Sequence, residues 1–243
     1  MPDAEFDQYA DDYVKTLNAS VQFAGAGAEF YAAYKAADLR RVWNTRHAEA
    51  DPRDIVDFGC GIGLGLRALA DRFPQSTIIG LDPSETSIEI ASGIRDENVR
   101  AHLLSDPWPD MCHNVDVVHS ACVFHHIAHD EHVETLQRIR EHLRPGGRLF
   151  IYEHNPFNPL TRHAVNTCPF DEDAVLITHS VMRQRMEDAG FVAVEVEHRL
   201  FLPQPLQRLH PVERLLKRLP LGGQYFVTGC RPNTDTPKAA ARS

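Results

Sequence analysis

An aspartate followed by glycines at every second position is the segment of this chain best suited to hold a ligand. Asp57 follows an apolar run, and Gly59, Gly61 and Gly63 come after it. Glycine adopts the positive φ angles that tight turns need and lets a ligand approach the backbone. A helical pattern starts near Gly63, so backbone N–H groups at a helix N-terminus can face that ligand. The pattern predicts a nucleotide-like cofactor site; the alternative is a glycine-rich turn that binds nothing.

The spacing of these glycines differs from the usual dinucleotide-binding pattern, G-x-G-x-x-G. Counting from Gly59 or Gly61 puts a leucine at the third glycine position, and a register that starts at Gly63 lies too far beyond the strand. The observed form, D-x-G-x-G-x-G, resembles motif I of the class I S-adenosylmethionine-dependent methyltransferases, in the small-molecule branch similar to ubiquinone and menaquinone methyltransferases. The resemblance implies S-adenosylmethionine as cofactor, S-adenosylhomocysteine as product, and Asp57 as partner of the cofactor's ammonium group.

Further cofactor contacts are expected at the next two strand ends and near the N-terminus. Asp82 can accept hydrogen bonds from both ribose hydroxyls, or it can cap the following helix. Asp106 resembles the family position that meets the adenine amino group, although an aspartate before a proline also starts turns. Residues 6–13 resemble the F-D-x-x-A-x-x-Y entrance, whose aromatic residues close over the cofactor; an amphipathic helix packed on the core is the alternative. The cofactor-binding residues implied are Tyr9, Tyr13, Asp57, Gly59, Cys60, Gly61, Asp82, Pro83, Asp106, Pro107 and Trp108.

Two adjacent histidines follow the fourth predicted strand, in the loop that borders the methyl group and the acceptor in this family. Methyl transfer is an in-line displacement in which the protein aims the acceptor atom and, where needed, removes a proton. Histidine takes up protons near neutral pH. His125, His126 and Glu153, at the end of the fifth strand, are therefore the candidate catalytic residues. A structural or cofactor-contact role for one of the histidines is the alternative.

The segment after Glu153 is expected to face the acceptor. Asn155 and Asn158 can fix a hydroxyl or carbonyl group, and Arg162 can pair with an anionic group. Asn-Pro pairs also form turns, so these residues can serve to shape the loop instead. The candidate substrate-binding residues are His154, Asn155, Asn158 and Arg162.

No metal site is expected. His125, His129 and His132 would share one face of a continuous helix and could then bind a metal. The helix is predicted to begin near Asp130, so the three histidines would not align. The five cysteines include no C-x-x-C pair, which argues against a zinc knuckle and a disulfide framework.

Strands and helices alternate through the middle of the chain, which predicts a parallel sheet with helices on both faces. The ligand is then expected beyond the carboxyl ends of the strands, beside the first strand. Two late strands without a long helix between them fit a reversed last strand. We therefore expect an α/β, Rossmann-like fold with a seven-stranded, mostly parallel sheet and a helical N-terminal cap. The predicted strands are 54–58, 77–82, 99–104, 115–121, 148–153, 191–198 and 224–230.

A chain of 243 residues is long enough for one sizeable core. We expect a single domain over residues 1–230, with 1–50 as the cap and 155–177 and 203–223 as acceptor-side insertions. Helices are predicted at 63–73, after Ser84, and at 130–143, 180–189 and 208–219. The polar residues 231–243 are expected to be disordered.

Composition limits the partners. The net charge of −9 argues against nucleic acid and anionic membranes. No stretch approaches the length of an apolar membrane span, and no signal peptide is visible, so a cytoplasmic location is expected. A small-molecule substrate is the expected partner, and the oligomeric state stays open.

We predict transfer of a methyl group from S-adenosylmethionine to a small organic acceptor. Residues 153–176 resemble bacterial methyltransferases associated with polysaccharide and secondary-metabolite pathways, which implies an acceptor from such a pathway. One alternative is an enzyme of the same fold that binds the cofactor but does non-methyl chemistry such as a cyclisation. The other is a non-catalytic cofactor-binding or regulatory subunit, in which the turn can serve structure alone.

Overall fold

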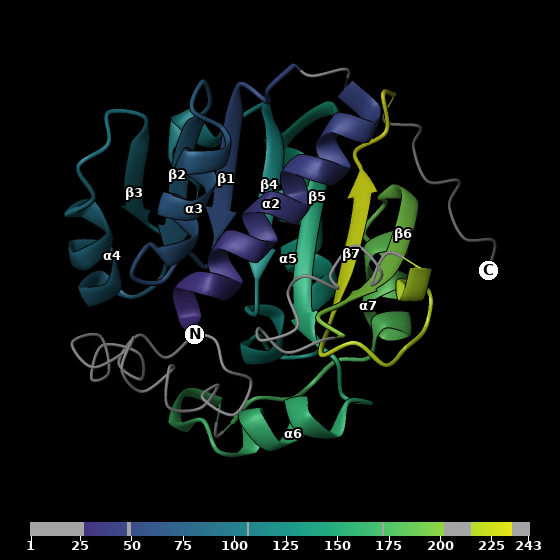
Figure 1. Cartoon of the computed structure of the whole chain (residues 1–243). Helices are drawn as coiled ribbons and strands as arrows, with labels where there is room; N and C mark the ends of the chain where they lie inside the picture. The colour runs from purple at the N-terminus through teal and green to yellow at the C-terminus, as the bar shows by residue number, and fades with distance from the viewer. Residues whose placement is uncertain (1–26, 48–49, 106, 172, 202–214, 235–243) are drawn as a thin grey trace.

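The computed structural model describes residues 27–47, 50–105, 107–171, 173–201 and 215–234 (Figure 1). Seven strands form one sheet in the order β3-β2-β1-β4-β5-β7-β6. β7 is antiparallel to both β5 and β6, whereas the other pairings are parallel. This confirms the expected fold with its reversed last strand. The strands are β1 (Asp54–Phe58), β2 (Thr77–Asp82), β3 (Val99–Leu103), β4 (Val115–Ala121), β5 (Leu143–His154), β6 (Val192–Arg199) and β7 (Gln224–Cys230).

Successive strand residues point to opposite faces of the sheet, and each face has its own apolar cluster. On β1, Ile55 packs in one cluster and Val56 in the other; Ile78 and Ile79 of β2 divide in the same way. Near-continuous apolar runs are typical of strands covered on both faces. Helices α2 (Ala28–His47), α3 (Leu64–Arg72) and α4 (Glu85–Ser92) cover one face, and α5 (His132–His142) and α7 (His179–Asp188) cover the other (Figure 1).

The parallel strands all end at the same edge of the sheet, and helix α6 (Pro159–Asn166) lies across that edge (Figure 1). Asn158 caps α6, because its side-chain oxygen accepts hydrogen bonds from the backbone N–H groups of Leu160 and Thr161. Pro159 occupies the first turn, where a missing N–H costs nothing. The predicted acceptor-side insertion thus contains a helix that the sequence pattern did not reveal.

Most predicted boundaries agree with the structure to within a residue or two. β5 is longer than predicted, because it begins at Leu143 and includes the Pro145-Gly146-Gly147 turn as an irregularity against β4. Helix α5 begins at His132, close to the predicted start near Asp130. Most of the predicted helix 208–219 and of the tail 231–243 lies outside the described residues, as do Tyr9 and Tyr13.

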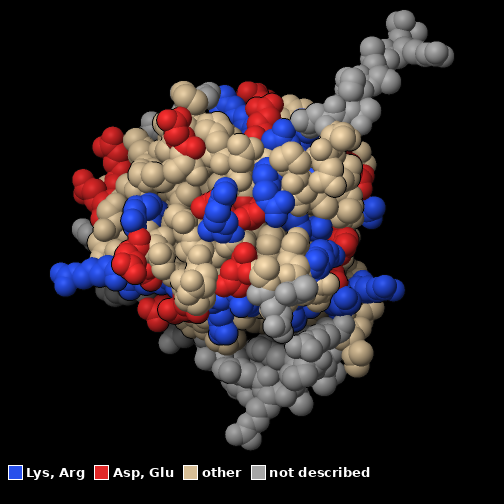
Figure 2. Space-filling view, turned by 90° about the horizontal axis from the view of Figure 1, so that it is seen from above, with Lys and Arg blue, Asp and Glu red and all other residues tan. Residues whose placement is uncertain are grey.

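The described helices include none that is both long and apolar enough to cross a membrane. On the face seen from above, which is the amino-terminal end of the parallel strands, basic and acidic side chains are interspersed among other residues (Figure 2). Ion pairs such as Arg46 with Glu195 and Arg53 with Asp54 join opposite charges.

Candidate cofactor and acceptor site

A cavity of about 540 Å³ lies at the carboxyl ends of β1, β2, β4 and β5. Lys35 of α2 and Leu160 of α6 contribute to its walls. Its position agrees with the rule that open α/β sheets bind ligands beyond the carboxyl ends of their strands. The predicted site residues that line it are Asp57, Gly59, Cys60, Gly61, Asp82, Pro83, His125, His126, His154 and Asn158.

The glycine turn joins β1 to α3 in a backbone conformation that other residues rarely adopt. Gly59, Gly61 and Gly63 have φ angles of 76°, 51° and 89°. A Cβ atom added to Gly59 would lie 2.4 Å from the Val123 side chain, so the loop after β4 packs directly on the turn. A Cβ at Gly61 would stand in open space beside the cavity. The turn therefore leaves room for a ligand at the backbone.

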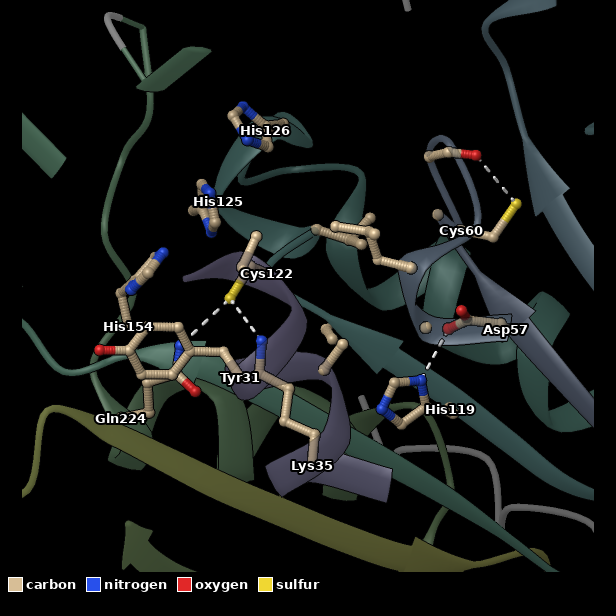
Figure 3. Close-up of a pocket in the computed structure, with 18 of the residues that line it drawn as sticks. Tyr31, Lys35, Asp57, Cys60, His119, Cys122, His125, His126, His154 and Gln224 are labelled. Carbon is tan, nitrogen blue, oxygen red and sulfur yellow. Dashed lines mark hydrogen bonds and ion pairs between the residues drawn. The ribbon is translucent and has the colours of Figure 1, made fainter. Parts of the chain in front are cut away.

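Asp57 lies at the base of this turn and is buried against a histidine from the neighbouring strand. His119 donates a hydrogen bond from Nδ1 to Asp57 Oδ1 at 2.6 Å, and the two residues are paired across β1 and β4 (Figure 3). A Cβ on Gly65 would lie 2.4 Å from Asp57 Oδ2, so only glycine admits the carboxylate there. The sequence reasoning missed His119 and Gly65 as site residues. A histidine directly after the apolar pair Val117-Val118 of β4 was the available signal.

Asp82 holds the glycine turn and the start of α4 together. Its Oδ2 accepts a hydrogen bond from Gly61 N at 2.8 Å, and its Oδ1 accepts one from Ser84 N at 3.0 Å. Ser84, rather than Asp82, caps α4 by accepting a hydrogen bond from Ser87 N. Asp82 also lines the cavity, and each oxygen of a carboxylate can accept more than one hydrogen bond.

The structure separates Trp108 from the other predicted cofactor residues. Trp108 is buried in the core, where its ring stacks on Phe58 at 5.6 Å and on His142 at 4.2 Å between centroids. Neither it nor the exposed Pro107 lines the cavity, and Asp106 is outside the described residues. Leu104 lines the cavity on this side instead.

Glu153 is 1% exposed and lies beneath the part of the cavity that Cys122, His125 and His154 line, which is called the acceptor end below for the role predicted from the sequence. It accepts hydrogen bonds from Val123 N at 3.0 Å, from Phe124 N at 2.8 Å and from His125 Nδ1 at 2.7 Å. Burial alone would raise the pKa of Glu153, but the charge and hydrogen bond of His125 hold it well below its usual range. Glu153 thus accepts three hydrogen bonds from the loop after β4 and positions that loop.

His125 lies between two carboxylates. Its Nε2 is 3.3 Å from Asp171 Oδ1, on the side opposite Glu153. Burial alone would lower the pKa of His125, but Glu153 and Asp171 raise it well above its usual range. An imidazole that keeps its proton is poorly suited to act as a general base near neutral pH. His126 is 21% exposed and is the more accessible of the two histidines.

Cys122 is a site residue that the sequence reasoning missed. It has a φ of 60°, an unusual value for a residue other than glycine. Its Sγ lies 3.5 Å from Lys35 Nζ and 3.4 Å from Gln224 Nε2 (Figure 3). Burial would raise the pKa of Cys122, but His154 and Lys35 lower it to about 6. The sulfur is therefore a thiolate at neutral pH, held among donors at the acceptor end.

The predicted substrate residues divide into two groups. His154 and Asn158 line the cavity, whereas Asn155 is fully buried beneath it and Arg162 is exposed outside it. The Asn155 amide donates hydrogen bonds to the carbonyls of Pro220 and Gly222. Its oxygen accepts one from Phe157 N. Asn155 thus organises the loop, which was the alternative role for the Asn-Pro pairs.

The histidines considered for a metal site do not gather. His132 is buried and bonded to Ile127 O and Arg185, while His129 lies beside Val175 O. His125 and His126 instead approach Asp171. One potential metal-ligand atom from each of these three residues lies within 4.8 Å of the other two.

Comparisons with known proteins point to methyltransferases. Residues 56–149 match the model of a methyltransferase domain family. The trans-aconitate 2-methyltransferase of Deinococcus radiodurans is 34% identical over 97 residues, which is 40% of this chain and 36% of that protein. The malonyl-[acyl-carrier protein] O-methyltransferase of Halalkalibacterium halodurans is 31% identical over 121 residues, 46% of this chain and 42% of that protein. The chain thus matches less than half of the length of these curated relatives.

The fold has counterparts among solved structures. Phosphoethanolamine N-methyltransferase 2 of Haemonchus contortus, in complex with S-adenosyl-L-methionine, aligns with a TM-score of 0.59 and 18% identity. The alignment covers 93% of this chain and 60% of that one. The expectation that this chain belongs to the branch similar to ubiquinone and menaquinone methyltransferases stays a prediction. With this domain match and these relatives, the chain is similar to S-adenosylmethionine-dependent methyltransferases over residues 56–149, and its fold is the one that such enzymes have.

Proposed function

We propose that this protein transfers a methyl group from S-adenosylmethionine to a small anionic acceptor. The observation that carries the proposal is the cavity. One end has the glycine turn with Asp57 and Asp82, and the other has Cys122 and His154. The first end suits a cofactor with an ammonium group and ribose hydroxyls. The second end is where an acceptor would meet the methyl group.

The cofactor end fits S-adenosylmethionine in shape and charge. Open space over Gly61 leaves the backbone accessible. Asp57 would hold the ammonium group and Asp82 the ribose hydroxyls. Bound S-adenosylmethionine supplies an electrophilic methyl group on a sulfonium centre. The chain's own task is to aim the acceptor atom at that methyl group and to keep water out, so proximity contributes much of the rate.

The acceptor end favours an anion. Lys35 and His154 both line the cavity, and the pKa of His154 is raised: burial would lower it, but the Cys122 thiolate outweighs that effect. Lys35 and His154 are thus two basic groups with which a carboxylate or another acid can pair. Trans-aconitate and malonyl-[acyl-carrier protein] are named in the relatives' activities. An acidic metabolite of a secondary-metabolite or polysaccharide pathway is the acceptor we propose.

Calorimetry with S-adenosylhomocysteine tests the cofactor assignment. The wild type is expected to bind, and Asp82→Ala is expected to weaken binding at least about tenfold, since it removes charge-assisted hydrogen bonds. Asp71→Ala is the matched control, because Asp71 is exposed on α3. No binding by the wild type at millimolar ligand would refute the proposal and favour the alternative of a non-catalytic regulatory subunit.

A labelled-methyl assay tests the reaction. The candidate acceptors are a panel of small acids, including trans-aconitate, and neutral sugars are the controls. Label in the acids alone supports an anionic acceptor, and label in sugars alone refutes it. A change of acceptor without label would favour the alternative of non-methyl chemistry on this fold.

A further inference from the structure

Two histidines and one carboxylate converge at the acceptor end of the cavity. His125 and His126 stand on the short 3-10 helix η4 (Phe124–His126) after β4, and Asp171 ends the 3-10 helix η5 (Pro169–Asp171). Figure 3 shows the two histidines on the loop that also carries Cys122, with His154 nearby. All three side chains line the cavity. Segments 45 residues apart in sequence, from His126 to Asp171, thus place three metal-binding groups together.

The separations between these groups also match those between ligand atoms around a metal ion. Nε2 of His125 and Nε2 of His126 lie 3.3 Å and 3.4 Å from the same atom, Asp171 Oδ1. Charge-assisted hydrogen bonds between such atoms are shorter, about 2.7–2.9 Å. Ligand atoms bound tetrahedrally at about 2.0–2.2 Å from a metal stand roughly 3.3–3.6 Å apart. The two Nε2–Oδ1 distances therefore match two edges of a tetrahedron of ligand atoms around a metal ion.

Glu153 prepares His125 for this role. It accepts a hydrogen bond from His125 Nδ1 at 2.7 Å, so Nε2 points toward Asp171 and offers a lone pair there once a metal ion displaces the Nε2 proton. Metal-binding histidines commonly donate their other ring N–H to a carboxylate, which fixes the tautomer and the ring orientation. Glu153 is itself held by the N–H groups of Val123 and Phe124. A lone pair that faces a carboxylate is unfavourable unless a cation, either a proton or a metal ion, lies between them.

We propose that His125, His126 and Asp171 bind a divalent transition-metal ion at the acceptor end of the cavity. Imidazole nitrogen suits Zn²⁺, Fe²⁺, Co²⁺ and Ni²⁺, whereas Mg²⁺ and Ca²⁺ prefer oxygen ligands alone. Three protein ligands leave open coordination positions for oxygen atoms of a bound molecule. If the proposed function holds, that molecule is the acceptor, and an acid with two neighbouring oxygen donors is the class that fits.

The site differs from the helical histidine set considered in the sequence. That set needed His129 and His132, which the structure directs elsewhere. Asp171 replaces them, and no local pattern joins it to the histidines.

Titration of the chelator-treated full chain with Co²⁺ tests the site, with visible absorption of the bound ion as the readout. The wild type is expected to bind one ion per chain with the spectrum of a mixed nitrogen and oxygen site. His126→Ala and Asp171→Asn are each expected to weaken binding at least about tenfold. His129→Ala is the control, because His129 is exposed nearby but does not belong to the cluster.

Absence of a Co²⁺ spectrum in the wild type, or equal affinity in all four proteins, would overturn the proposal. The second result would mean that a proton, not a metal, lies between His125 and Asp171. Calorimetry with S-adenosylhomocysteine on the same samples checks that the variants are folded and tests the cofactor site separately. Loss of cofactor binding with intact Co²⁺ binding would refute the proposed function and leave the metal site standing.

Discussion

Glu153 and His125 form a buried pair in which the carboxylate Oε2 lies 2.7 Å from the imidazole Nδ1, and both side chains are 1% exposed. The pair joins the end of β5 to the loop after β4, and the same carboxylate holds two backbone N–H groups of that loop. Glu153 therefore shapes the acceptor end without lining it. This arrangement assigns it a positioning role instead of the candidate catalytic role that the sequence suggested.

Replacing Glu153 with alanine is expected to destabilise the protein by about 3–5 kcal/mol, because the imidazole and the N–H groups lose their buried partner. Glu153→Gln keeps an acceptor for the N–H groups and is expected to cost less than half as much. Urea unfolding measures both. Equal losses for the two variants would show that the hydrogen bonds to the loop contribute little.

The Cys122 thiol is expected to react unusually fast with iodoacetamide. Its pKa of about 6 means that the thiolate fraction, and with it the alkylation rate, rises between pH 5 and 7 and then levels off. Burial raises the pKa of Cys112 to about 11, so that thiol should react slowly at neutral pH. Mass spectrometry of peptides measures the alkylation rate of each cysteine separately.

Lys35→Met removes a positive charge from beside Cys122 and is expected to slow its alkylation at pH 7. An unchanged rate profile would show that Lys35 does not stabilise the thiolate.

Local sequence patterns predicted the sheet and the cofactor end of the cavity because both depend on short segments. Apolar runs located the strands, and the glycine spacing after Asp57 located the turn, whose positive φ angles are present. The ring of Trp108 could not be placed in this way. Its neighbours Phe58 and His142 come from distant segments, and their packing draws it into the core.

The acceptor end was harder to predict because tertiary packing assembles it. Lys35 is 87 positions from Cys122, and Gln224 is 102 positions from it. Asp171 reaches His125 across 46 positions. No periodicity or motif links such residues, and the left-handed backbone of Cys122 has no glycine to mark it.

A methyl group added at Gly65 is expected to weaken binding of S-adenosylhomocysteine. Its Cβ would lie 2.4 Å from Asp57 Oδ2, so the carboxylate would have to move from its place beside His119. Gly65→Ala should therefore lower affinity at least about tenfold, the scale of one lost charged hydrogen bond. Gly93→Ala is the control, since Gly93 has an ordinary φ of −73° at the end of α4. Calorimetry measures the affinity of both variants for S-adenosylhomocysteine. Equal affinities would contradict the idea that cofactor binding depends on the position of the Asp57 carboxylate.

Acid is expected to destabilise the protein partly through His198. Burial is the largest cause that lowers its pKa, and His179 of α7 and Arg199 on the same strand add to it, so that the pKa falls to about 4. Between pH 4 and about 6.5, the unfolded state therefore binds a proton that the folded state does not. The contribution of the neutral His198 to the free energy of unfolding is fully present above about pH 6.5. It is lost as the pH falls toward 4, and the loss is at most about 3 kcal/mol. Urea unfolding of the wild type and His198→Phe from pH 4 to 7.5 measures this. The wild type should lose more stability than the variant within that window, and parallel profiles would show that His198 keeps an ordinary pKa in the folded protein.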